Sequence, residues 1–142
     1  MNTKHRIKAS IWPIEKLPGL SEQNQVQLKA YGICNTKQLL QRARTVKLQN
    51  AIATQLKINV SYVKKWVALA DLSCLPNVGY KYCGVLLHSG IASITQLAQT
   101  PPHRLHRQIL KMQVATMQRR DLCPTVDEVQ QWVEQAKAII NG

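Results

Sequence analysis

The chain of 142 residues contains two related copies of one segment. Shifting the sequence by 58 residues superimposes residues 17–40 on residues 75–98, and many positions then hold the same residue. The identical pairs are Leu17 and Leu75, Pro18 and Pro76, Leu28 and Leu86, Gly32 and Gly90, Ile33 and Ile91, Gln38 and Gln96, and Leu39 and Leu97. A repeat of this length is one supersecondary unit, and neighbouring units stack to bury a shared core. We therefore expect two similar units packed against each other.

A second match, at an offset of 66, joins residues 62–70 to residues 128–136 and pairs Trp66 with Trp132. Each copy therefore ends in a similar helix, and the matched positions predict that both indole rings lie in the core. The change of offset implies about eight additional residues in the second copy, around residues 111–124.

Helix signals occur along the whole chain, whereas no stretch alternates apolar and polar residues as a half-buried strand does. Gly32 suits a left-handed C-cap, and Thr125 with Glu128 forms a capping box before the last helix. The N-caps expected in the first copy are Ser21 or Glu22, Asn35, Thr45, and Asn59 or Ser61. The apolar positions expected there include Val26 and Leu28 in one helix, and Leu48, Ala51, Ile52 and Leu56 in another. The predicted fold class is all-α.

The charge distribution limits the kinds of partner. Nineteen Lys and Arg residues face seven Asp and Glu residues, which gives a net charge of +12. No acidic residue lies between Glu22 and Asp71, or between Asp71 and Asp121. Such an excess attracts polyanions over a Debye length of about 8–10 Å. Nucleic acid or an acidic protein surface is therefore favoured as a partner over a charge that serves solubility alone.

The turn that opens each copy carries a recognisable pattern. Leu17-Pro18-Gly19-Leu20-Ser21 in the first copy matches Leu75-Pro76-Asn77-Val78-Gly79 in the second, and a Gly-Ile pair follows each. This pattern resembles the helix-hairpin-helix motif. The tandem arrangement, with a W-V-x-x-A helix after each copy, resembles the family of domain of unknown function 4332 over roughly residues 12–140. The resemblance implies two tandem helix-hairpin-helix units packed as a single compact helical domain, and it favours nucleic acid as the ligand.

The resemblance also implies how a phosphate would be bound. Glycines let the turn approach a phosphate closely, and amides at the start of the second helix point at its oxygens. Each copy keeps one of the two turn glycines, since Ser21 and Asn77 replace the others. Asn77 tolerates a left-handed backbone, whereas Glu22 beside the first turn would repel a phosphate. We therefore expect the second hairpin to be the better phosphate binder and the first to be more structural, although the motif also serves as a packing element alone.

The predicted architecture and site follow from these observations. Residues 1–11 form a basic arm, residues 12–70 the first unit and residues 71–142 the second, with Trp12 packing the arm onto the first hairpin. The site expected to contact nucleic acid comprises Asn77, Val78, Gly79 and Tyr80 at the second turn and the cations Lys81, Lys64, Lys65, Arg104, Arg107 and Lys111. Gly19, Leu20 and Ser21 form a secondary hairpin site. We expect a non-enzymatic module that binds the backbone of double-stranded nucleic acid, DNA favoured, with little sequence specificity. The alternative is an adaptor that docks on an acidic protein surface, with purely structural hairpins.

Other function classes find little support in the sequence. His103 and His106 have the spacing of a metal pair, but no third ligand is near and arginines flank them, so no metal or cofactor is expected. No nucleophile stands beside a base, so an enzyme is not expected. No apolar run approaches the ~20 residues that cross a membrane, and no secretion signal is recognised, so we expect a cytoplasmic location. The four cysteines contain no C-x-x-C pair and are expected to be small buried residues in a reducing compartment.

Overall fold

Side-chain caps open six of the helices in the computed structural model, which describes residues 8–115 and 123–141. Each capping oxygen accepts a hydrogen bond from an amide two or three residues later in the chain. These oxygens belong to Ser21, Asn35, Thr45, Asn59, Ser93 and Thr125. The predicted caps of the first copy are confirmed, and so is the capping box, in which Glu128 also accepts from the Thr125 amide at 3.0 Å.

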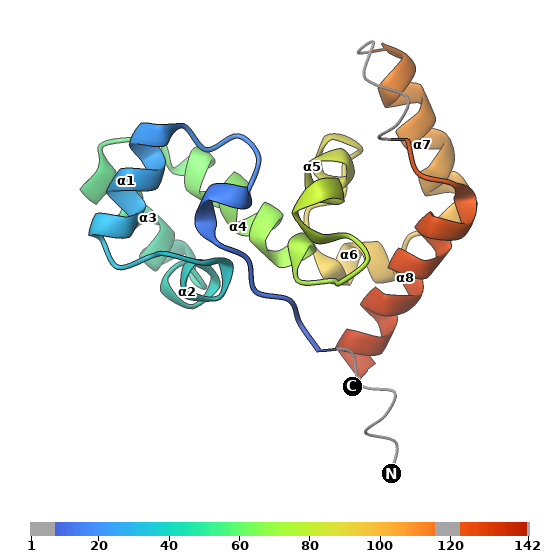
Figure 1. Cartoon of the computed structure of the whole chain (residues 1–142), viewed down its shortest axis with the longest axis horizontal. Coiled ribbons are helices and arrows are strands. Elements are labelled where there is room, and N and C mark those ends of the chain that lie inside the picture. The colour runs from blue at the N-terminus through green and yellow to red at the C-terminus, as the bar shows by residue number, and fades with distance from the viewer. Residues whose placement is uncertain (1–7, 116–122, 142) are drawn as a thin grey trace.

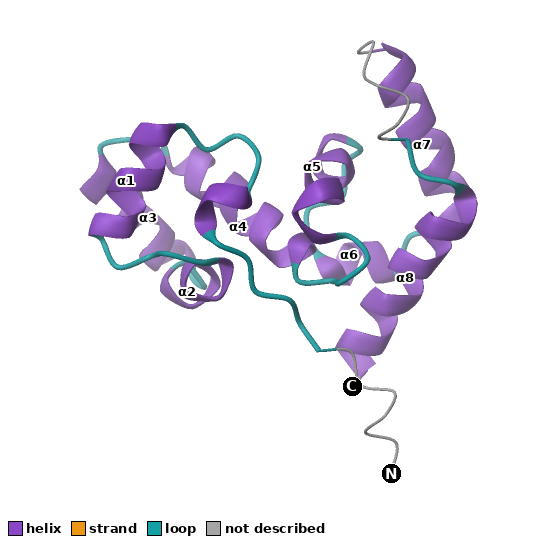
Figure 2. Ribbon diagram, in the orientation of Figure 1, coloured by secondary structure: helices purple, strands orange, loops and turns teal. Residues whose placement is uncertain are grey.

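The described residues form eight α-helices and one short 3-10 helix, with no strand among them (Figures 1 and 2). The prediction of an all-α fold is confirmed. In chain order the elements are η2 (Ile14–Lys16), α1 (Glu22–Ala30), α2 (Thr36–Arg42), α3 (Val46–Leu56), α4 (Val60–Ser73), α5 (Gly79–His88), α6 (Ile94–Ala98), α7 (Pro102–Ala115) and α8 (Val126–Asn141).

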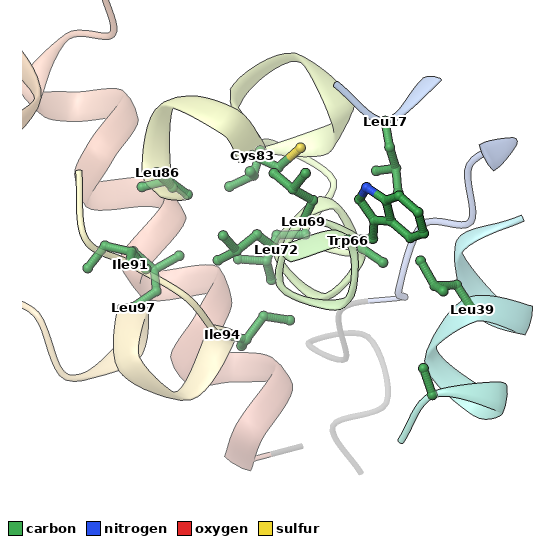
Figure 3. Close-up of a cluster of buried hydrophobic side chains, with 14 of the residues drawn as sticks. Leu17, Leu39, Trp66, Leu69, Leu72, Cys83, Leu86, Ile91, Ile94 and Leu97 are labelled. Carbon is green, nitrogen blue, oxygen red and sulfur yellow. The ribbon is translucent and has the colours of Figure 1, made fainter. Parts of the chain in front are cut away.

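Helix α4 is shared by the two copies. It packs against α2 and α3 of the first copy and against α5 of the second, while α8 packs against α6 and α7. Figure 1 shows α1, α2 and α3 at one end of the molecule and α7 and α8 at the other, with α4 running between them. In Figure 3, Trp66, Leu69 and Leu72 of α4 lie between Leu17 and Leu39 of the first copy and Leu86, Ile91 and Leu97 of the second. The two copies therefore share one core, in which Trp66 and Trp132 are each 1% exposed.

The repeat is visible in the way that matched helices end. Gly32 has a φ of 88° and Gly90 a φ of 95°, so each supplies the left-handed residue after its helix. The next amide then closes the turn: Ile33 donates to Leu28 O at 2.8 Å, and Ile91 donates to Leu86 O at 3.0 Å. These equivalent hydrogen bonds show that the sequence match corresponds to the same local structure in both copies.

The two copies differ in what precedes each turn. The second turn follows the 14-residue α4, whereas the first follows an extended segment and the three-residue η2. The left-handed residues also differ, because φ is 82° at Gly19 but 55° at Gly79, which occupy different positions of the pattern. Among the described non-glycine residues only Lys57 has a positive φ, so the second turn forms without a left-handed Asn77. The first turn thus lacks the α-helix that would precede it in a hairpin of two α-helices.

Some expected apolar positions face solvent. Val26 is 67% exposed and Leu48 is 38% exposed, and Ala51 is also exposed. Val26 lies two positions before the buried Leu28, which places it about 200° away around the helix. Cys34 is exposed as well, because it stands in the loop before α2 rather than in the core. The predicted arm falls largely on residues 1–7, which lie outside the described residues, as do residues 116–122 of the expected insertion.

Candidate nucleic-acid interface

Most of the backbone amides of the second turn donate hydrogen bonds to other groups of the protein. Val78 and Gly79 both donate their amides to Leu75 O, at 3.0 and 2.9 Å. The Asn77 amide donates to Gln135 Oε1 of α8 at 3.2 Å. The prediction that the Val78 and Gly79 amides face a phosphate is therefore wrong, because the turn uses them to close on itself.

Two indole rings cover the same turn. Trp12 donates its ring N–H to Ser73 O at 2.7 Å, and a Cβ placed on Gly79 would stand 3.4 Å from the Trp12 ring. From the other side, Trp132 donates its ring N–H to Asn77 O at 3.1 Å. The expectation that Trp12 packs on the first hairpin is thus wrong. The extended segment that carries Trp12 reaches the second turn and buries Gly79.

The start of α5 remains open beyond the covered turn. The amides of Tyr80 and Lys81 meet no acceptor among the described residues, and both residues are exposed. The ammonium of Lys16 lies 5.5 Å from the centre of the Tyr80 ring, and that of Lys81 lies 5.1 Å from the Tyr82 ring. This helix N-terminus therefore has open amides and two cations nearby, Lys16 beside the Tyr80 ring and Lys81 beside the Tyr82 ring. A helix start with free amides and nearby cations favours an anion.

The first turn is the more open of the two. Gly19 is exposed, and a Cβ placed on it would stand 3.7 Å from Lys65 Nζ, so the ammonium of α4 lies against the turn. The amides of Leu20, Ser21 and Glu22 meet no acceptor among the described residues, while Ser21 Oγ accepts from the Asn24 amide. The sequence assigned Lys65 to the second turn. The structure places it at the first, because Lys65 lies eight residues before the end of α4, and only that end leads into the second turn.

Residues 16–19 follow α5 along its length and join the two sites. Lys16 lies at Tyr80 in the first turn of the helix, and a Cβ on Gly84 would stand 3.4 Å from Pro18 Cγ. Gly19 shares a small cavity of about 70 Å³ with Lys65 and with His88 at the end of α5. The ten residues of α5 span about 15 Å. We call Lys16, Lys81, Lys65 and His88 the α5 strip, with two of them at each end of the helix.

The α5 strip has few acidic neighbours. Glu15, beside Lys16, accepts a hydrogen bond from Lys29 Nζ at 3.0 Å, which is the one ion pair found among the described residues. Hydrogen bonds from its own backbone and from Lys29 lower the pKa of Glu15, so this carboxylate is ionised and matched by a cation. Glu22 is the other acid near the first turn, and it is exposed in the first turn of α1.

The remaining predicted cations lie elsewhere. Lys64 is exposed on α4, and Arg104, Arg107 and Lys111 are exposed on α7. Helix α7 packs mainly against α8, and Figure 1 shows it beyond α5 as seen from α1. None of the contacts that define the α5 strip involves these four residues. The structure therefore replaces the single predicted site by the α5 strip and a separate row of cations on α7.

Lys16 and His88 are not among the site residues predicted from the sequence. They join the strip only because residues 16–19 pack along α5. Their positions depend on contacts between residues more than 60 positions apart, and no local pattern indicates these contacts. Within residues 8–115 and 123–141, no group of three or more side chains could hold a metal ion. No helix in these ranges is long and apolar enough to cross a membrane.

Comparison with known proteins gives one result. A family model described as Domain of unknown function (DUF4332) matches residues 18–139, which include both copies of the repeat. No curated protein and no solved structure matches the chain.

Proposed function

Since this chain belongs to the family described as domain of unknown function (DUF4332), whose description leaves the activity open, we propose its function from its geometry. The chain is a non-enzymatic module that binds the phosphate backbone of double-stranded nucleic acid, with DNA as the favoured duplex. The α5 strip is the contact surface. The observation that carries the proposal is that the Tyr80 and Lys81 amides are free at the start of α5, where Lys16 lies beside the Tyr80 ring and Lys81 beside the Tyr82 ring.

The chemistry of this helix end suits a phosphate. The first amides of a helix carry partial positive charge, and a phosphate oxygen that accepts from them also lies near the positive end of the helix dipole. Lys16 and Lys81 add two full positive charges. Together these groups match the charge of a phosphate. Within the described part of the chain, no acidic side chain is hydrogen-bonded at this end of the helix.

The far end of the strip supplies a second contact. The Gly19 turn lacks a side chain that would keep a phosphate away, and Lys65 lies against it. The two ends lie about 15 Å apart, whereas successive phosphates of one strand advance about 3.4 Å along the duplex axis. The strip is therefore long enough to contact several phosphates of the backbone.

The remaining features of the proposal follow from the same residues. The strip contains cations and amides, which position a duplex but do not distinguish one base pair from another, so little sequence specificity is expected. No side-chain nucleophile paired with a base is part of the strip, and we propose no catalytic step. The four free cysteines suit a reducing compartment, and we place the protein in the cytoplasm.

Fluorescence anisotropy with a short labelled DNA duplex tests the proposal. If the strip neutralises about four phosphates, the logarithm of the association constant falls against the logarithm of salt concentration with a slope of about −3.6. Lys16→Glu, Lys65→Glu and Lys81→Glu each remove one contact, so each should weaken binding severalfold and reduce the slope by about 0.9. Lys47→Glu, on the exposed start of α3, is the matched control with the same change of net charge.

The Lys47→Glu control distinguishes binding at the α5 strip from general electrostatic attraction to a basic protein. If the three strip variants weaken duplex binding no more than Lys47→Glu, the duplex proposal is overturned. The second candidate, an adaptor for an acidic protein surface, would then take its place. That candidate is favoured by one observation: the many cations among the described residues form a single ion pair, so most of the positive charge is unmatched within the chain.

A further inference from the structure

A second feature of the molecule has chemistry that a nucleic-acid backbone does not need. A groove of about 460 Å³ runs between the extended segment before η2 and the exposed side of α2. It is lined by Ala9, Ser10, Ile11, Lys37, Leu40, Gln41, Arg44 and Cys74. Ligand sites for single small molecules usually measure about 300–1,000 Å³ and are mostly apolar with a few polar groups. The groove matches this description in size and in lining.

The walls of the groove are held in place by hydrogen bonds. The Ser10 amide donates to Cys74 O at 2.8 Å, which ties the extended segment to the residue after α4. The Trp12 amide donates to Thr36 Oγ1 at 3.0 Å, and the Thr36 amide donates to Trp12 O at 2.9 Å. These bonds fix the segment against the start of α2. The groove is therefore formed before any ligand enters.

The lining combines apolar surface with two cations. Ile11 is 53% exposed, so a large part of an apolar side chain faces water beside Leu40. Burial, with a smaller effect of nearby Asp71, raises the pKa of Cys74 to about 11, so its thiol stays uncharged at neutral pH. Lys37 lies in the first turn of α2 and Arg44 lies two residues beyond its end, roughly 10 Å away along the chain direction. None of the described residues that line the groove is acidic.

We propose that this groove binds a single-chain amphipathic carboxylate, of the class of medium-chain fatty acids. The chain would cover Ile11 and Leu40, and the carboxylate would lie beside Lys37 or Arg44. Residues 1–7 of the protein do not have this chemistry, because they include Lys4, His5 and Arg6 and no acid. A nucleic-acid backbone offers the charge but has no apolar chain to bury. The site is independent of the α5 strip, since the two share no residue.

Titration calorimetry with sodium decanoate, below the concentration at which it forms micelles, tests the proposal. We expect saturable binding of one decanoate per chain and weaker binding of 1-decanol, which has the same chain without the charge. Shortening the ligand to octanoate should weaken binding by up to about 15-fold, because each buried methylene contributes up to about fourfold.

Variants of the lining separate the charge from the apolar surface. Lys37→Gln and Arg44→Gln should each weaken decanoate binding by about two- to fivefold and leave decanol binding unchanged. Leu40→Asn should weaken the binding of both ligands. Lys47→Gln is the matched control and should change neither. The proposal is overturned if decanoate does not saturate, if decanol binds as tightly, or if the control variant has the same effect as Lys37→Gln and Arg44→Gln.

Measuring decanoate binding and duplex binding together tests whether the two sites are independent. Saturating decanoate should leave duplex affinity unchanged, and Lys65→Glu should leave decanoate affinity unchanged. Competition between decanoate and the duplex would overturn an independent site. A failure of decanoate to bind would leave the salt slope of duplex binding as it is, so the two proposals fail separately.

Discussion

Asp71 is a half-buried acid with a structural role. It stands near the end of α4, and its Oδ2 accepts the Ile94 amide of α6 at 2.9 Å. Burial raises the pKa of Asp71, and the hydrogen bond from Ile94 opposes that rise. The carboxylate is therefore retained at a desolvation cost, and what it supplies is an acceptor for the first amide of a five-residue helix. The side-chain oxygen of an asparagine could accept the same hydrogen bond from the Ile94 amide without carrying a charge.

This predicts opposite outcomes for two substitutions at Asp71. Asp71→Ala leaves the Ile94 amide without its acceptor and should lower the free energy of unfolding by about 1 kcal/mol. Asp71→Asn keeps an acceptor and should be at least as stable as the parent at pH 7. The pKa of Asp71 is higher in the folded protein than in the unfolded chain, so protonation at low pH makes the parent more stable. The stability of Asp71→Asn does not change in this way. Any advantage of Asp71→Asn should therefore vanish below pH 3.8, the ordinary pKa of the group.

Urea denaturation at pH 7 and at acid pH measures both effects. An Asp71→Ala protein as stable as the parent would show that the Ile94 hydrogen bond contributes nothing to stability. A pH-independent difference between Asp71→Asn and the parent would show that burial does not disfavour the charge.

Individual residues also show where sequence analysis succeeds. Ser21, Asn35 and Thr45 are confirmed as caps because their partners lie only three positions away, where spacing alone indicates the contact. Asp71 and Ile94 lie 23 positions apart, and Trp12 and Ser73 lie 61 apart. Contacts of that kind depend on how helices pack. No pattern in the sequence indicates them.

At the scale of elements, the last helix shows how a short motif sets a boundary. The Glu128 amide donates to Thr125 Oγ1 at 3.1 Å, and Glu128 Oε1 accepts from the Thr125 amide. Helix α8 then buries Val129, Trp132, Val133 and Ala136 against the second copy. The cap therefore fixes the start of the helix whose apolar face closes that half of the core.

We predict that Thr125→Ala lowers the free energy of unfolding by about 1 kcal/mol, since it removes the side-chain acceptor of the capping box. Thr54→Ala is the matched control. Thr54 is exposed within α3, where alanine has the higher helix propensity, so that change should be neutral or slightly stabilising. Thermal unfolding followed by circular dichroism distinguishes the two. Equal effects of both substitutions would contradict a capping role for Thr125.

The elements before the two turns differ, although the two copies share an apolar position there. Ile14 and Leu72 occupy matched positions and both are fully buried, yet one lies in a 3-10 helix and the other in α4. Pro13 removes a backbone donor just before Ile14, whereas the matched Asp71 continues α4. The leucine and isoleucine residues that are identical in the two copies are buried in both, as Leu28 and Leu86 show. The repeat did not predict the length of the helix that carries them.

At the scale of the whole molecule, the two copies depend on each other. Helix α4 contributes Trp66 to the first copy and Leu72 to the shared core, and Trp12 of the leading segment covers Gly79 of the second copy. Neither copy therefore has a complete core of its own. This dependence is a property of the packing, which the sequence match alone presents as two separate units.

We predict that the chain unfolds in a single cooperative transition. The loss of helix, measured by far-ultraviolet circular dichroism, should coincide with the change in tryptophan fluorescence, since Trp66 and Trp132 lie in different parts of one core and Trp12 covers Gly79. Trp12→Phe should shift both curves together to lower denaturant. Two separated transitions, or a shift in only one of the two signals, would mean that the copies unfold independently.

The covering of Gly79 by Trp12 has a consequence for how such a protein could grow. In an open array, each unit meets only its neighbours, so further units can be inserted without disturbing the others. Here the extended segment before η2 of the first copy reaches the second turn, and a third copy placed between the two would separate the Trp12 ring from Gly79. The two copies therefore form a closed pair, and adding a third would require another side chain to cover the turn at Gly79.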